Sequence, residues 1–580
     1  MTPNDHPAVQ RRRRSLIGRA ALATASVLAL GVPALFTAGT TTAASHPSAL
    51  SIAMTLGTAT HATWWAPISS SSDCLTVTGG VGEGLNYYMP LIWIGNGGTV
   101  DLAHSVASSI KISNNDRTFT VTIGKRWVWS NGQPVTAQDV VLDAKLLEAA
   151  SAPKSPLPYC FAGTGGMPSD WQSVTALNAT TLQITLKQPA NPQWFELDGL
   201  AQLVPLPSEW NKYPTNATKE LQWINQVAAQ PTNPIYQVVD GPYSIEKIVN
   251  NQYYYFKANP KYAGKKPSIA TLIYDYEPSD AAQFAAFRTG QLQLGTLPPE
   301  FWSARGQLKG YTLQKAPVWA FDFMVLNFTN KTPGVGSLFN QLYVRQAMQY
   351  GIDQTGISQA IFHGAAYPTL NPVPTTSAQY DHHLKNPYPF DPAKGKALLE
   401  AHGWKMVNGV MTKSGKKLSF TFAYATGSLA AQDEVENIQA DWAKEGIQAV
   451  LKPMGANSFD TMFGNPAAFS KWSVALGLWI YAPDFFPDGT FMFPPGAGFN
   501  LGDYNNPEMT KIVNETIAPG TPAQTKARFA AYEEYAATQL PVLYVPTQEN
   551  LNLVSNQVGG WFPNYNIIAS QPLVEYLHWK

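Results

Sequence analysis

The sequence predicts an α/β protein of several lobes. Strand-like and helix-like patterns alternate along the whole chain, and no repeat of the solenoid kind replaces them. The chain has 580 residues, enough for about three or four domains. Its apolar fraction of 45% is ordinary for a globular core, so a largely disordered chain is excluded.

Four short segments have the composition of buried strands. They are rich in β-branched and aromatic residues and often alternate between apolar and polar positions, which is the period of a strand. The four predicted strands are TFTVTI (118–123), TLQITL (181–186), TLIYDY (271–276) and LSFTFAYA (418–425).

Capping residues mark the predicted helices. Thr136 with Asp139 three residues later has the pattern of a capping box, and Asp391 followed by proline starts a second helix. The predicted helices are 136–150, 391–404, 432–447 and 521–540. Pro-rich stretches at 152–158, 368–374 and 483–495 predict loops or lobe edges.

The first 44 residues have the pattern of an export signal. A run of four arginines is followed by an apolar stretch and then by small residues near Ala43 and Ala44. Arg13-Arg14 and the residues after it also resemble a twin-arginine signal. We expect an exported protein in the cell envelope or outside the cell. If the segment is not cleaved, it would anchor the protein to the membrane.

Charge and cysteine content limit the classes of function. Charged residues make up only 13% of the chain, and the 39 basic and 39 acidic residues balance, so no basic field is available to hold nucleic acid. Cleavage after Ala44 would leave a net charge near −4.

Cys74 and Cys160 are the two cysteines, and in an oxidising compartment we expect a disulfide between them. No cysteine follows the apolar run, so no lipid-attachment site is indicated.

The stretch LWIYAPDFFPDGTFMF (478–493) concentrates aromatic rings around Asp484 and Asp488. Three interpretations stay open at this point. The two carboxylates could be the acid and base of a glycoside hydrolase. The rings could line a binding pocket in which one carboxylate meets a positive charge of the ligand. The stretch could also be a core strand that ends in a turn.

The motifs that the sequence lacks favour a binding protein over an enzyme. Zinc-protease, nucleophile-elbow, phosphate-loop and dinucleotide motifs are absent from the sequence. Asp381, His382 and His383 share one loop with His363 nearby, but adjacent histidines rarely ligate one metal, so no metal site is predicted. Seventeen tryptophans without a catalytic signature favour a large aromatic-lined binding site.

Five segments of the chain have the pattern of known motifs. The first, WVWSNGQPVTAQDVV (127–141), is similar to a W-x-DG-x-PLTA-x-DVV motif. The other four are DGPYSIEKIVNNQYYYFKANPKYAG (240–264), AAFRTGQLQLG (285–295), LYVRQAMQYGID (342–353) and DPAKGKALLEAHGW (391–404). In this order they resemble the dipeptide- and oligopeptide-binding family (family 5) of extracellular solute-binding proteins, and the resemblance runs from about residue 50 to the C-terminus.

This resemblance implies two lobes that close on a ligand, with an additional domain in the first lobe. The implied division is 45–82, 226–318 and 545–580 for lobe I, 83–225 for the additional domain and 319–544 for lobe II, after the export signal 1–44. The chain should cross between the lobes twice, near Trp319–Asn327 and near LPVLYVPTQENL (540–551).

The resemblance also implies the site. In the peptide-binding branch a carboxylate after a tryptophan pairs with the α-ammonium of the peptide, and Trp479 and Asp484 are the matching residues, five apart instead of three. The implied function is capture of a ligand, expected to be a peptide, and its delivery to an ABC-type membrane permease. No enzyme activity and no cofactor are expected, and the protein should be a monomer. The full set of expected ligand contacts is Asp484, Trp479, Tyr481, Trp319, Phe321, Tyr87 and Tyr88.

Two alternatives remain. A binding protein of this kind could instead take an oligosaccharide or a metal chelate. A protein of another class, a secreted glycoside hydrolase, would use Asp484 and Asp488 as its catalytic pair.

Overall fold

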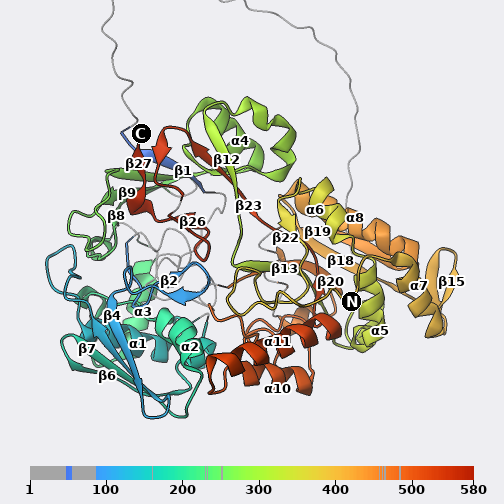
Figure 1. The fold of residues 1–580 in the computed structure, drawn as a ribbon, viewed down its shortest axis with the longest axis horizontal. Coiled ribbons are helices and arrows are strands. Elements are labelled where there is room, and N and C mark those ends of the chain that lie inside the picture. Colours follow the sequence, from blue (N-terminus) through green and yellow to red (C-terminus); the bar gives the residue numbers. More distant parts are fainter. Residues whose placement is uncertain are drawn as a thin grey trace, which may run out of the picture. The chain divides into compact units, whose positions relative to one another are not determined.

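The structure is a computed structural model in which Pro47–Lys580 form one compact unit. It describes residues 48–54, 87–159, 161–228, 230, 233–249, 252–455, 458–459, 462, 465–481, 485–562 and 564–580. The export segment, Cys74, Cys160 and Asp484 lie outside these residues, so the predicted disulfide and the predicted ammonium partner stay predictions. Figure 1 labels strands of the two large sheets.

A seven-stranded mixed sheet collects strands from distant parts of the chain. Its order is β12-β23-β11-β1-β10-β9-β8, with β1 parallel to β10 and β11, and the other pairs antiparallel. The strands are β1 (Leu50–Met54), β8 (Tyr243–Val249), β9 (Tyr253–Ala258), β10 (Thr271–Tyr276), β11 (Leu294–Thr296), β12 (Tyr311–Ala316) and β23 (Asn550–Ser555). The predicted strand at 271–276 is confirmed.

A five-stranded sheet is built from the second half of the chain. Its order is β19-β18-β20-β13-β21, and β20 lies between the parallel β18 and the antiparallel β13. The strands are β13 (Ala320–Leu326), β18 (Ser419–Ala425), β19 (Gln448–Met454), β20 (Val474–Ile480) and β21 (Leu543–Tyr544). The predicted strand at 418–425 begins one residue later than expected.

A separate antiparallel sheet of order β4-β5-β7-β6 contains the other two predicted strands. Its members are β4 (Ala107–Ser113), β5 (Thr118–Ile123), β6 (Trp171–Asn178) and β7 (Thr181–Leu186). Smaller pairings are β2 (Ile94–Gly95) with β3 (Thr99–Val100), β14 (Ala366–Tyr367) with β22 (Thr547–Gln548), β24 (Val558–Gly559) with β27 (His578–Trp579), and β25 (Tyr565–Asn566) with β26 (Gln571–Pro572).

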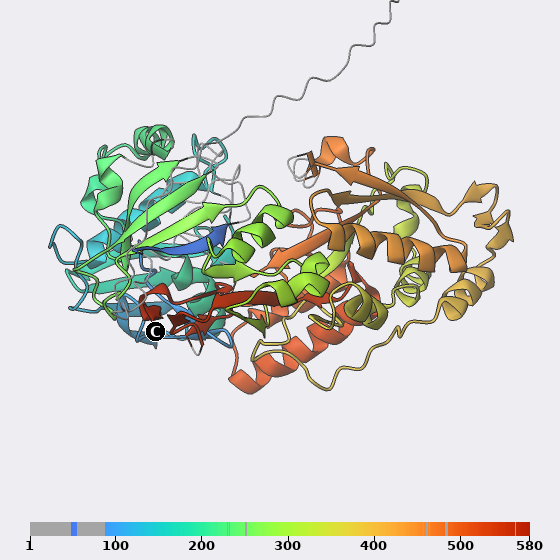
Figure 2. The ribbon, with the colours of Figure 1, turned by 90° about the horizontal axis from the view of Figure 1, so that it is seen from above.

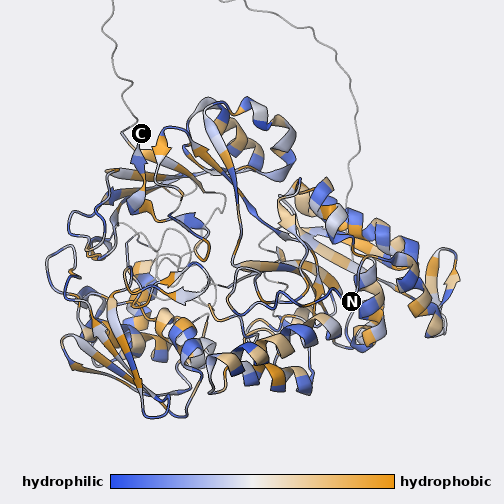
Figure 3. Ribbon diagram, viewed as in Figure 1, coloured by the Kyte–Doolittle hydropathy of each residue, from blue (hydrophilic) through white to orange (hydrophobic). Residues whose placement is uncertain are grey.

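The helices pack on these sheets and on one another. They are α1 (Ala137–Ala150), α2 (Pro192–Trp194), α3 (Ala217–Ala228), α4 (Asp280–Thr289), α5 (Leu342–Tyr350), α6 (Gln354–Ala360), α7 (Pro392–Ala401), α8 (Leu429–Glu445), α10 (Pro507–Thr516) and α11 (Pro522–Gln539), together with the 3-10 segment η8 (Pro299–Gln307). Hydrophobic and hydrophilic residues alternate along α8, α10 and α11, as Figure 3 shows. Among the described residues, no helix combines the length and apolarity that crossing a membrane requires.

Local side chains explain where the predicted helices begin. The Thr136 N–H donates to Asp139 Oδ2 at 2.8 Å, which satisfies one of the free donors at the start of α1. Asp391 Oδ1 accepts the Lys394 N–H at 3.0 Å at the start of α7. α8 begins at Leu429, three residues before the predicted start, and has its own cap. These starts are therefore encoded within a few residues of each helix.

The chain crosses between the two large sheets twice, and the crossings lie side by side. Residues 317–319 join β12 to β13, and the segment after β21 returns through β22 to β23. Ala316 pairs with Asn550 on one side, and Phe323 pairs with Tyr544 on the other. Figure 2, turned by 90° from Figure 1, shows the same strands from above.

Asn327 fastens the far end of β13 to the segment that precedes β20. Its buried side-chain amide donates to Phe469 O at 2.8 Å and to Trp472 O at 2.9 Å. Its Oδ1 accepts both the N–H and the hydroxyl of Thr329. One side chain therefore satisfies several buried polar groups.

Asn327→Ala is expected to lower the free energy of unfolding by about 3 kcal/mol, because it leaves buried carbonyl groups without donors. Urea denaturation measures this loss. Gln307→Ala, at an exposed position at the end of η8, serves as the control and should change stability little. Equal stability of the two variants would contradict the assigned role of Asn327.

Candidate functional site

The candidate site is the sheet junction, which we define as residues 316–322 and 544–550, the two crossings between the large sheets. The register of β13 against β20 places Phe321 opposite Trp479 and Asp322 opposite Leu478. Beyond the end of β20, the Tyr481 N–H donates to Trp319 O at 2.9 Å. The junction thus brings four of the predicted ligand-contact residues together.

The rings of these four residues are buried, with at most 7% of their surface exposed. Phe321 and Tyr481 stack with their ring centroids 6.0 Å apart, and Trp479 meets Tyr481 edge-on at 6.0 Å. The Tyr481 hydroxyl donates to Pro372 O at 3.0 Å, in the predicted loop 368–374. Their contact with a ligand is not visible in this packing and stays a prediction.

Trp319 lies against the turn between β2 and β3. A Cβ built on Gly98 would lie 2.8 Å from Cη2 of the indole, and Gly98 has a positive φ of 70°. Only glycine adopts this backbone readily and leaves room for the ring. The turn and the indole therefore hold the first crossing in a defined place.

The structure places Tyr87 and Tyr88 in another aromatic group. The two rings are 4.9 Å apart, Tyr88 lies edge-on to Trp129 at 6.3 Å, and its hydroxyl accepts from Trp210 Nε1 at 2.8 Å. Tyr87 also stacks on Phe256 of β9. These tyrosines connect Trp129 and Trp210 to β9 of the seven-stranded sheet, and their role in ligand binding stays a prediction.

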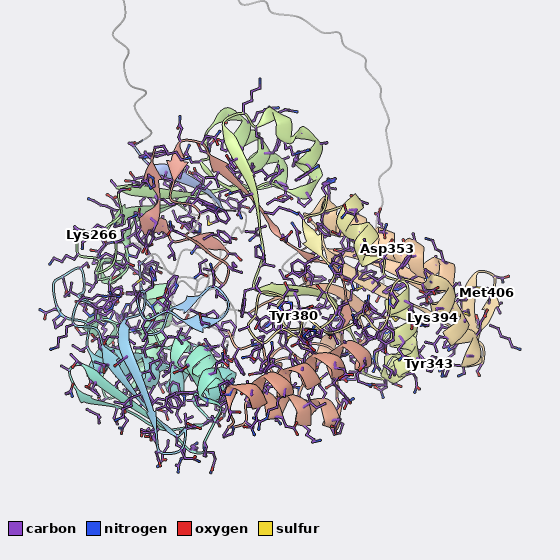
Figure 4. The ribbon with its side chains drawn as sticks, in the orientation of Figure 1. Lys266, Tyr343, Asp353, Tyr380, Lys394 and Met406 are labelled. Carbon is purple, nitrogen blue, oxygen red and sulfur yellow. The ribbon has the colours of Figure 1, made fainter. Side chains whose placement is uncertain are left out.

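A small pocket opens beside the first crossing. The lining comes from the start of β13, from β14 and the loop after it, and from β22, and includes Phe321, Tyr367, Thr369, Asn371, Tyr380 and Thr547. The walls lie so close together that no ligand fits between them in this arrangement. Figure 4 labels Tyr380.

Two carboxylates that the sequence analysis did not single out lie at the junction. Asp322 Oδ2 accepts the Gln548 N–H at 2.9 Å, and the Asp322 N–H donates to Thr547 Oγ1 at 3.0 Å, so this residue links the two crossings. Burial raises the pKa of Asp322 to about 7, although the Gln548 N–H favours its charged form. Burial, and then the charge of Asp322, raise the pKa of Glu434 on α8 well above its ordinary value.

A second acidic group lies where η8 meets α8. Burial, and then the charges of Asp280 and Asp433, raise the pKa of Glu300 to about 6. On the other flank, Lys315 Nζ lies 3.8 Å from Glu549. The junction is therefore surrounded by carboxyl groups, several of which are buried and hold their protons more tightly than exposed ones do. The aspartate between two phenylalanines in AFDF was the one sequence signal that could have identified Asp322.

Asp488 lies in the interior, with 1% of its surface exposed. Its Oδ1 accepts the Thr490 N–H at 2.6 Å and closes a turn. Burial raises the pKa of Asp488 to about 7. This is the geometry of a turn-forming residue rather than of a group open to a sugar. The described residues also contain no group of three or more His, Cys, Asp or Glu side chains arranged to hold a metal ion.

Asp322→Asn is expected to stabilise the protein at pH 8 and to change little at pH 4. Because the folded pKa of about 7 exceeds the ordinary 3.8, the fold holds a proton that the unfolded chain releases. The resulting stability is present below about pH 4 and is lost as the pH rises through 7. Asparagine keeps an acceptor for Gln548, so we expect a gain of about 2 kcal/mol at pH 8, allowing for partial exposure.

Urea denaturation of both proteins at pH 4 and pH 8 measures this difference. A loss of stability in Asp322→Asn at pH 8 would show instead that the ionised carboxylate stabilises the fold.

Comparison with known proteins agrees with this arrangement. The chain is 24% identical over 535 residues to the oligopeptide-binding protein OppA of Lactococcus lactis subsp. cremoris, covering 87% of this chain and 86% of OppA. The structure of the oligopeptide-binding protein AppA from Bacillus subtilis, in complex with a nonapeptide, superposes with a TM-score of 0.73 at 19% identity, over 92% of this chain and 98% of AppA.

A third relative is known with a different ligand. NikZ from Campylobacter jejuni, in complex with Ni(L-His), superposes with a TM-score of 0.70 at 17% identity, over 88% of this chain and 95% of NikZ. These similarities confirm the predicted two-lobed fold. Residues 101–501 match the model of the bacterial extracellular solute-binding proteins, family 5. The chain belongs to this family of extracellular solute-binding proteins.

Proposed function

We propose that the protein binds a peptide and delivers it to the membrane permease of an ABC importer. The observation that carries the proposal is the sheet junction, where buried aromatic rings and carboxylates gather at the two crossings of the chain. When the lobes part, these rings would provide apolar surface for an extended ligand, and a carboxylate would offset the cost of desolvating an ammonium group. The similarity to OppA and to peptide-bound AppA supports the choice of a peptide.

The ligand is proposed to be enclosed by movement of two lobes about the sheet junction. Lobe I comprises 45–82, 226–318 and 545–580 with the additional domain 83–225, and lobe II comprises 319–544. The division is supported by the strands, since the seven-stranded sheet takes β12 and β23 while the five-stranded sheet takes β13 and β21. Each crossing is a few residues long, which suits a hinge that absorbs a rotation.

Trp319, Phe321, Trp479 and Tyr481 are proposed to form the apolar bed of the site, with Asp484 as the partner of the ammonium group. Tyr87 and Tyr88 would complete it from the other side. Asp322 and Glu434 would favour a positive ligand through release of the protons that burial makes them retain. We further propose that the protein performs no chemistry, since Asp488 serves a turn in the described structure.

The protein is proposed to act as a monomer in the cell envelope or outside the cell, after export directed by residues 1–44. The family's extracellular character supports this location.

Native mass spectrometry of the exported protein, before and after denaturation and refolding, tests the proposal. Refolding removes ligand carried from the host, so the untreated sample should carry a mixture of peptide masses that the refolded one lacks. Added peptides should restore the mass shifts. A refolded protein that takes up only oligosaccharides, or only a metal chelate, would overturn the proposed ligand and leave the family intact.

Asp484→Asn is expected to weaken binding of a peptide with a free N-terminus about 30-fold or more, because a buried ammonium would lose its charged partner. Isothermal titration calorimetry measures the loss. N-acetylation of the peptide should weaken binding to the unmodified protein to a similar degree and add little in the variant, since both remove the same interaction.

Asp488→Asn is the matched control, since it makes the same chemical change four residues away in a buried turn. It should leave peptide affinity within about threefold. Loss of binding by Asp488→Asn with no loss by Asp484→Asn would refute the assignment.

A further inference from the structure

A small lysine-rich sheet follows α7. It comprises β15 (Lys405–Val407), β16 (Val410–Lys413) and β17 (Lys416–Lys417), and we call residues 404–418 the lysine hairpin. These fifteen residues contain four lysines and no acidic residue, although the whole chain has equal numbers of basic and acidic residues. The function proposed above assigns no role to this hairpin.

Strand register gathers the four lysines. Lys405 and Lys417 both pair with Thr412, so they flank it in one row across the sheet. Lys413 pairs with Lys416 beside the turn. Side chains of directly paired residues lie on the same face and about 5 Å apart at Cβ, and those of successive residues lie on opposite faces. Lys405 and Lys417 therefore share one face of the small sheet, and Lys413 and Lys416 share the other face beside the turn.

These charges are not neutralised within the described part of the chain. All four lysines are exposed, and none of them takes part in an ion pair among the described residues. The preceding helix adds exposed Lys394, and its Lys396 is paired at 3.8 Å with Glu400. Like charges held this close repel one another, so the arrangement would gain from an anionic partner.

Apolar side chains lie among the lysines. Met406 and Val407 are 39% and 46% exposed, whereas the neighbouring Met411 is fully buried. Both methionine side chains pack against Gly446, so Val407, which shares a face with Lys405, is the freer apolar side chain. Figure 4 labels Met406 on the hairpin and Lys394 on α7. Exposed apolar groups within a basic group suit a boundary where the apolar atoms leave water and the ammonium groups stay at the surface.

We propose that the lysine hairpin binds the surface of an anionic phospholipid bilayer. Lysine is depleted in the cores of protein–protein interfaces, and the hairpin offers no arginine, while its one aromatic side chain, Trp404, is buried and cannot serve as an anchor. Lysines beside exposed apolar side chains are instead the composition of surfaces that lie on anionic membranes. This contact would hold the exported protein at the membrane through lobe II, whether or not a ligand is bound.

Vesicle flotation of the exported protein tests the proposal. Vesicles of equal parts phosphatidylglycerol and phosphatidylcholine should carry the protein upward, and pure phosphatidylcholine vesicles should not. Binding should fall sharply between 0.1 M and 1 M salt, where the screening length drops from about 10 Å to about 3 Å. Replacing Lys405, Lys413, Lys416 and Lys417 by glutamine should lower the partition coefficient about 100-fold or more, at about fivefold for each lysine.

The matched control replaces Lys111, Lys125, Lys219 and Lys309, which are exposed elsewhere, and so makes the same change in net charge. It should bind vesicles within about threefold of the unmodified protein. Met406→Ser with Val407→Ser should weaken binding and leave its salt dependence in place. Unchanged ligand affinity and melting temperature show that each variant is folded.

An equal loss of vesicle binding in the control variant would show that net charge alone explains the effect, and it would overturn the proposal. A hairpin variant that floats with the vesicles as the unmodified protein does would overturn it too. Failure to bind vesicles, combined with hairpin-dependent capture by the detergent-solubilised permease, would assign this surface to a protein partner instead.

Discussion

Main-chain hydrogen bonds hold the two crossings of the sheet junction next to each other, and the arrangement of the site follows from them. β12 pairs with β23 on one side and β13 pairs with β21 on the other, so neither crossing can slide past its neighbour. Asp322 adds side-chain and main-chain bonds to Thr547 and Gln548 between these pairings. A paired, two-segment connection can bend while keeping its register, which is the motion that enclosing a ligand requires.

The same connection determines the electrostatics of the site. β13 enters the five-stranded sheet with Asp322, whose charge adds to burial in raising the pKa of Glu434 on α8. At neutral pH such groups retain protons that exposed carboxylates would lose. The acidic junction is thus less negative than its composition suggests, and a cationic ligand that displaces those protons would interact with it more strongly.

Ligand capture and membrane contact involve different parts of the chain with different chemistry. The junction buries aromatic rings and carboxylates between two sheets, whereas the lysine hairpin exposes lysines and two apolar side chains on three short strands. Binding at the hairpin would leave the crossings free to bend, because the two regions share no residues. A solute-binding protein held near the membrane would meet its permease more often than one diffusing in three dimensions.

The sequence by itself determined the local elements, the family and the approximate crossing points, because caps, strand patterns and ordered motifs depend on residues close together in the chain. α1 and α7 begin at their predicted caps, whereas the first crossing, residues 317–319, begins two residues before the predicted segment 319–327. Tertiary structure alone decided the pairing of Asp322 with residues 547–548, its approach to Glu434 and the separate grouping of Tyr87 and Tyr88. These contacts join residues more than a hundred positions apart, and burial, which sets their pKa values, depends on the packed whole.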